Sequence, residues 1–108
     1  MDRAQTYWGG EVEVSVEPHE MRMSHWVYAP KFADISGEQI LFDLTGKLWD
    51  LISVSESEDA LDLQLRKYPG DRPQVTLQVQ RKGRVILVAG KPVDGAELER
   101  HLDTALIK

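Results

Sequence analysis

The sequence contains no cysteine, and this absence excludes several kinds of site. Disulfide bridges, thiol nucleophiles and thiolate zinc sites all need that side chain. A lack of cysteine also fits a reducing compartment, and we expect the chain to be cytoplasmic. The N-terminal residues lack the apolar run of a signal peptide, and no window approaches the ~18 apolar residues of a membrane helix. The sequence therefore predicts no membrane partner.

Basic residues are also in short supply, with 13 Lys and Arg against 18 Asp and Glu, which leaves a net charge of −5. A mildly acidic chain is weakly repelled by phosphate backbones, so we expect no nucleic-acid partner. The basic stretch 81–84 is short, as is common at the tip of a polar hairpin. The acidic run 55–59 is typical of a solvated loop and could steer a basic partner.

Recognisable catalytic motifs are missing as well. The chain has no nucleophile elbow, no phosphate-binding loop and no glycine-rich dinucleotide fingerprint. Its three histidines, His19, His25 and His101, lack the short spacings of metal ligands, and we place His19 in a turn. The sequence therefore predicts no catalytic residue, no metal and no cofactor, and it favours a non-enzymatic protein.

What the sequence does contain is two-residue alternation of apolar and polar side chains, the pattern of half-buried strands. The 108 residues are one domain's worth, and we expect a single globular domain over 1–108. Pro18 should end the first strand because proline cannot donate to a ladder. Gly9 and Gly10 should free residues 1–10 as a flexible or covering N-terminal arm. We expect strands over 11–17, 21–28, 39–44, 48–54, 61–67, 74–80 and 84–89.

The segment 37–53 allows two interpretations. Its apolar residues alternate, which favours a hairpin of strands 39–44 and 48–54, but several also fall near helical spacing. A helix would place Gly46 in mid-span at a cost of about 1 kcal/mol, so we prefer the hairpin. Asp43 and Asp50 would then flank the turn, with Lys47 close enough to pair with either.

The chain should end in an amphipathic helix over 94–107. Asp94 is a suitable N-cap and Glu97 stands three residues later, as in a capping box. One helical face is formed by Leu98, His101, Leu102, Ala105 and Leu106. Together these elements predict a mainly β fold of the α+β kind. We expect a curved antiparallel meander or small open barrel of about six to seven strands with one C-terminal helix.

The stretch "MRMSHWVYAP" at 21–30 gathers more large amphipathic side chains than any other. Strand alternation places Arg22, Ser24, Trp26 and Tyr28 on one face and Met21, Met23, His25 and Val27 on the other. Trp, Tyr and Arg are enriched at binding hot spots, so the first face is a candidate contact surface. The other large aromatic candidates for that surface are Trp8 and Trp49.

Two functions follow as hypotheses. The first is a non-enzymatic protein-binding domain, such as an inhibitor, immunity-type or adaptor protein, that contacts another protein or a second copy of itself through the aromatic strand face. The second is a small-ligand-binding β-barrel whose pocket is lined by Met21, Met23, Val27, Phe42 and Leu44, with His25 as its polar group.

Overall fold

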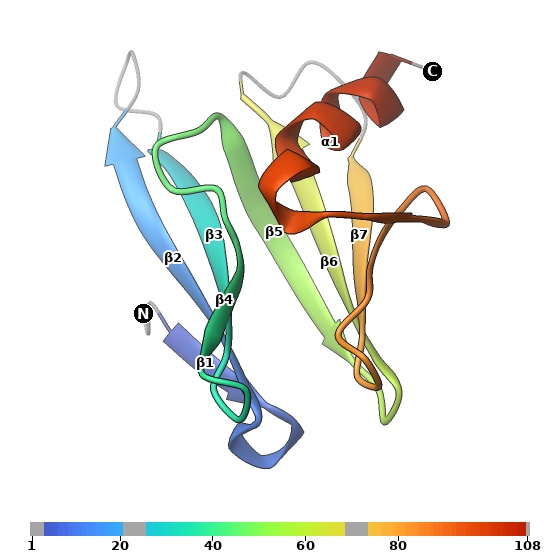
Figure 1. Cartoon of the computed structure of the whole chain (residues 1–108). Coiled ribbons are helices and arrows are strands. Elements are labelled where there is room, and N and C mark those ends of the chain that lie inside the picture. Colours follow the sequence, from blue (N-terminus) through green and yellow to red (C-terminus); the bar gives the residue numbers. More distant parts are fainter. Residues whose placement is uncertain (1–3, 21–25, 69–73, 108) are drawn as a thin grey trace.

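The computed structural model describes residues 4–20, 26–68 and 74–107, and within them the protein is mainly β. Two antiparallel sheets each follow the order of the chain, and one helix lies at the C-terminus (Figure 1). The first sheet contains β1 (Ala4–Tyr7), β2 (Val12–Glu20), β3 (Trp26–Asp34) and β4 (Gln39–Asp43). The second contains β5 (Trp49–Glu56), β6 (Ala60–Lys67), β7 (Val75–Gln80), β8 (Ile86–Val88) and β9 (Lys91–Val93). The predicted curved meander is therefore confirmed.

The alternating segments form strands because every second side chain enters a shared core. In β6 the leucines at 61, 63 and 65 are fully buried, while the two residues between them are half-buried. β7 pairs with β6 in the register Leu63↔Leu77 and repeats the pattern with its own apolar side chains. The predicted hairpin of 74–80 and 84–89 is confirmed by the pairs Leu77↔Val88 and Val79↔Ile86.

The prediction that Pro18 ends the first strand is wrong, because β2 continues through it to Glu20. Tyr28 lies directly opposite Pro18, and its N–H is donated to Asp50 on the far side of β3. The backbones of Pro18 and Tyr28 therefore do not hydrogen-bond to each other. The nitrogen of Pro18, which carries no hydrogen, faces the outer edge of the sheet. β1 pairs with β2 only from Val12 to Ser15, so no described strand needs a donor from Pro18.

The segment 39–54 forms two strands, but the predicted hairpin between them is wrong. β4 pairs with β3 and β5 pairs with β6, so the chain crosses from one sheet to the other between them. The carboxylate of Asp43 accepts bonds from the N–H and hydroxyl of Thr45, and Leu44 donates to Pro30. These contacts turn the chain across β3, and β5 then runs beside the other half of that strand (Figure 1).

The sequence analysis did not predict two short edge strands, β1 and β9. β1 shows that the described part of the N-terminal arm is paired to the sheet instead of being free. It leads into a 3-10 turn over Trp8–Gly10, in which all three residues adopt a positive φ. Gly9 and Gly10 thus shape an ordered turn, because glycine adopts this backbone conformation without steric cost.

The C-terminal helix α1 (Leu98–Ile107) covers one side of the second sheet, as predicted from its apolar face. Leu98, Leu102 and Leu106 are buried in the core, and His101 and Ala105 are half-buried at its margin. A 3-10 turn, η3 (Gly95–Glu97), precedes it, and Asp94 caps that turn by accepting from Ala96 N–H. Because η3 lies against β4, it joins the helix to the first sheet.

Candidate functional site

Trp26 and Tyr28 occupy one phase of β3, as the sequence predicts. Trp26 is 48% exposed and Tyr28 is half-buried, whereas Val27, between them, is 1% exposed. Farther along the same phase, Phe32 is fully buried in the core. The face that packs against the second sheet at one end of β3 is therefore open at the other. Arg22 and Ser24, predicted on this face, lie outside the described residues.

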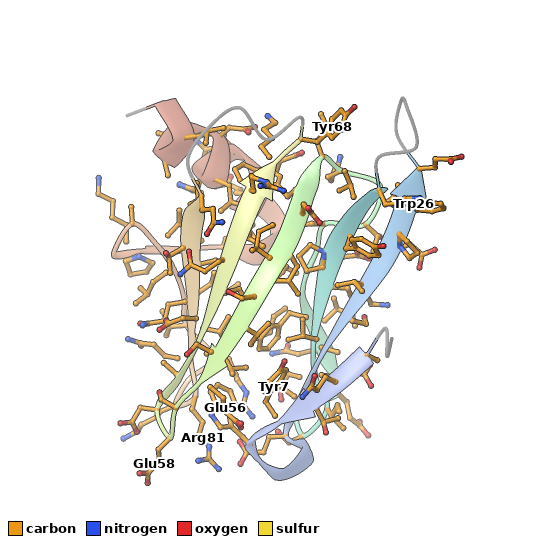
Figure 2. All side chains as sticks on the ribbon, turned by 180° about the vertical axis from the view of Figure 1, so that it is seen from behind. Tyr7, Trp26, Glu56, Glu58, Tyr68 and Arg81 are labelled. Carbon is orange, nitrogen blue, oxygen red and sulfur yellow. The ribbon has the colours of Figure 1, made fainter. Side chains whose placement is uncertain are left out.

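The cross-strand neighbour of Trp26 comes from the adjoining strand β2. β2 places Glu20 directly opposite Trp26 and Pro18 opposite Tyr28, so these four side chains share one face. Figure 2 shows Trp26 and Tyr68 toward the same end of the molecule. The Tyr68 N–H donates to the carbonyl of Leu48, whose side chain is 40% exposed. We call Pro18, Glu20, Trp26 and Tyr28 the Trp26 face.

Asp50 fixes the backbone beneath this face. Its Oδ1 accepts the N–H of Tyr28 at 2.9 Å, which links β5 to β3 across the two sheets. Burial raises the pKa of this carboxyl and outweighs the opposing effects of the Tyr28 hydrogen bond and the charge of Arg66. Folding therefore favours the protonated acid, whose carbonyl oxygen can still accept the Tyr28 N–H.

We expect the Asp50→Asn variant to have a higher melting temperature than the wild type at pH 7. An amide oxygen can still accept from Tyr28, but it carries no charge to desolvate. A raised folded pKa contributes stability below the ordinary value near 4, and that contribution is lost as the pH rises through the folded pKa. The gain should therefore shrink toward pH 3, where both side chains are neutral. Calorimetry at pH 7 and pH 3 measures the gain in melting temperature. An equal gain at both pH values would show that the charge of Asp50 is not its cause.

Trp8 and Trp49, the other two tryptophans predicted as binding residues, lie away from this surface. Trp49 is fully buried, and Trp8 is 7% exposed. Trp8 donates its indole N–H to the Ser57 carbonyl at 2.7 Å and its backbone N–H to Glu56 at 2.7 Å. Trp8 therefore joins the turn after β1 to the far end of β5, and a partner docking on the Trp26 face would not reach either ring.

Around Trp8 the structure builds an ion cluster that the sequence analysis missed. Glu11 accepts from Arg81 at 2.6 Å and from Arg84 at 3.1 Å, and both guanidinium groups lie over the Trp8 ring. Arg84 also approaches the buried carboxylate of Asp34 at 3.3 Å. We call these five residues the inter-sheet ion cluster. The basic stretch 81–84, expected to be a simple polar tip, is instead bonded to the first sheet.

The residues predicted to line a ligand pocket are packed or undescribed. Phe42 and Leu44 are each 3% exposed within the core, and Val27 is buried. Met21, Met23 and His25 lie outside the described residues. The two sheets form no closed barrel. The described members of this predicted lining are therefore residues of the protein interior.

An open groove of about 640 Å³ lies instead between β1, β2 and the turn after β4. Its lining includes His19, which is part of β2 and not of a turn as predicted. His19 Nε2 accepts the Gly46 N–H at 2.9 Å, so this nitrogen already has a partner. Lys47, expected beside Asp43 or Asp50, pairs with Glu99 of α1 at 3.7 Å. In the described part of the chain, no three His, Asp or Glu side chains could together hold a metal ion.

Comparison of the chain with protein-family models, with curated protein sequences and with solved structures finds no match. Among the described helical residues, no segment has the length and apolar character needed to cross a bilayer.

Proposed function

We infer that the protein is a non-enzymatic cytoplasmic binding domain that contacts another protein through the Trp26 face. The observation that carries this proposal is the exposure of Trp26 on a regular strand of the sheet. An exposed tryptophan ring is unfavourable for the free protein, because burying an aromatic side chain is strongly favourable. Trp and Tyr are also the residues that most often dominate the energy of protein interfaces.

Rigidity of the backbone supports the same proposal. Trp26 and Tyr28 lie on a strand that is paired along its full length to β2 and bonded to Asp50 on the other side. A partner would therefore meet side chains whose backbone is already ordered, which lowers the entropy lost on binding. The acidic net charge of −5 suits a basic partner, whose approach it would accelerate.

Site-specific photo-crosslinking tests the proposal. We expect benzoylphenylalanine in place of Trp26, expressed in the native host, to give an adduct of defined mass. The same group in place of Ile40 is the matched control, because Ile40 is 53% exposed on β4 and pairs with Ala33, near the other end of β3 from Trp26. An adduct of twice the mass of the chain would identify the partner as a second copy. No adduct at 26, or equal adducts at both positions, would contradict the proposal.

A further inference from the structure

The two buried tryptophans share an arrangement that the described residues form only in part around the exposed one. Over the ring of Trp8 lie the guanidinium groups of Arg81 and Arg84, 5.7 and 5.4 Å from the ring centre, and Glu11 holds both. Over the ring of Trp49 lies the ammonium group of Lys67 at 5.9 Å, held by Asp103 at 2.6 Å. All these distances fall within the ~6 Å over which a cation is attracted to a ring face.

Two of the three members of this arrangement are present at Trp26, namely its own ring and the carboxylate of Glu20. Glu20 is its cross-strand partner, just as Lys67 is the cross-strand partner of Trp49. The pair Pro18↔Tyr28 is not hydrogen-bonded across the strands. Because the two kinds of pair alternate along an antiparallel ladder, the pair Glu20↔Trp26, two residues farther on, is not hydrogen-bonded either. Such pairs have the closer spacing, with Cα atoms about 4.5 Å apart, so the side chains stand next to each other.

The described residues supply no cation for this third position. Among the described residues, no Lys or Arg lies over the Trp26 ring and none forms an ion pair with Glu20. Both side chains are exposed, so a cation from outside can reach them.

We propose that Trp26 and Glu20 together bind an arginine side chain of the partner protein. The guanidinium group lies over the indole ring while its N–H groups donate to the Glu20 carboxylate, as those of Arg81 and Arg84 do between Trp8 and Glu11. Arginine fits better than lysine, because a planar group can stack and donate in pairs at the same time. This inference rests on the proposed function and specifies the chemistry of its partner.

Titration with a hexa-arginine peptide at low salt, followed by the indole N–H resonances, tests the proposal. The chain has three tryptophans, and the Trp26→Phe variant identifies the resonance of Trp26 by its loss. We expect that resonance to shift on titration and the Trp26→Leu variant to bind roughly three- to thirtyfold more weakly. Hexa-lysine should bind more weakly than hexa-arginine.

The matched control separates a specific site from general attraction to an acidic protein. Glu17→Gln removes the same charge from an exposed position of β2 that lies on the opposite face from Glu20. We expect Glu20→Gln to weaken binding several-fold and Glu17→Gln to have a smaller effect. Equal effects of the two substitutions, or no effect of Trp26→Leu, would overturn the proposal.

Two further outcomes are decisive. If Arg22→Gln binds the peptide more tightly than the wild type, the chain's own arginine occupies the position and the partner's cation is excluded. If crosslinking at position 26 succeeds while the peptide does not bind there, the Trp26 face contacts its partner by other chemistry. That result would overturn this inference and leave the proposed function standing.

Discussion

The Gly95→Ala variant should lose a large part of its folding stability. A Cβ atom at position 95 would lie 1.9 Å from the carbonyl oxygen of Leu41 and 3.1 Å from its carbonyl carbon. Both atoms belong to the backbone of β4, whose residues on either side of Leu41 are paired with β3, so they cannot move aside as a flexible side chain could. Relief of the clash requires η3 to move away from β4.

That movement would disturb the core, because α1 follows η3 without a break. Leu98, the first residue of the helix, is 1% exposed, and Leu102 is fully buried one turn later. We expect the free energy of unfolding to fall by about 3 kcal/mol, at the upper end of the range for overpacking. A domain of this size has only about 5–15 kcal/mol in total, so the loss would be severe.

Urea unfolding of Gly95→Ala beside Gly46→Ala measures the effect. Gly46 has a φ of +82° and nothing within 4 Å of an added Cβ, so its substitution brings backbone strain without a clash. That strain should cost about 1–2 kcal/mol. If Gly95→Ala loses no more stability than Gly46→Ala, the close approach of η3 to β4 is not limiting.

The strands were largely predictable from the sequence because their signal is local. The alternation in β2, β6 and β7 reports which side chains are buried, and the spacing of leucines reports the helix in the same way. Pairing between strands is not local. The apolar residues of β4 and β5 would alternate equally well in a hairpin, and the contacts of Asp43 and Leu44 at the crossing to the other sheet leave no mark in that alternation.

In the candidate site, too, the local features were predictable and the non-local ones were not. The period of two placed Trp26 and Tyr28 on one face and Val27 on the other, and the structure agrees. The sequence could not distinguish exposed Trp26 from buried Trp8 and Trp49, because burial depends on residues far away in the chain. Trp8 is covered by arginines more than 70 residues later, at 81 and 84.

The second large effect is expected for Arg84→Met in the inter-sheet ion cluster. The Arg84 side chain is 14% exposed, and it faces the Asp34 side chain, which is 7% exposed. Methionine fills similar space but leaves a buried carboxylate without a nearby cation. Removing one partner of a buried ion pair typically costs about 3–5 kcal/mol, and we expect a loss of about 3 kcal/mol.

Arg81→Met is the matched control. Arg81 shares the partner Glu11 and the ring of Trp8 with Arg84, but its side chain is 37% exposed and it does not contact Asp34. Its loss should destabilise the protein much less, because water can replace an exposed ion pair. If the two variants unfold at the same urea concentration, the Asp34 contact is not the source of the effect.

The pH dependence identifies Asp34 as the group responsible. Burial pushes the pKa of Asp34 upward, but hydrogen bonds from Ser36 and Gly37 and the charge of Arg84 hold it below its ordinary value. A lowered folded pKa contributes stability above the ordinary value near 4, and that contribution is lost as the pH falls through the folded pKa. Without Arg84 this contribution of Asp34 is smaller. The difference in the free energy of unfolding between Arg84→Met and the wild type should therefore be largest at pH 7 and decrease in acid.

The double variant Arg84→Met/Asp34→Asn completes the argument. If the cost of Arg84→Met comes from the uncompensated carboxylate, neutralising that carboxylate should recover part of the lost stability. The amide oxygen introduced at position 34 could still accept from the Ser36 hydroxyl and the Gly37 N–H, so the turn between β3 and β4 would keep its hydrogen bonds. The double variant should then be more stable than the sum of the two single losses predicts. Simple additivity would instead assign the effect of Arg84 to its contacts with Glu11 and the Trp8 ring.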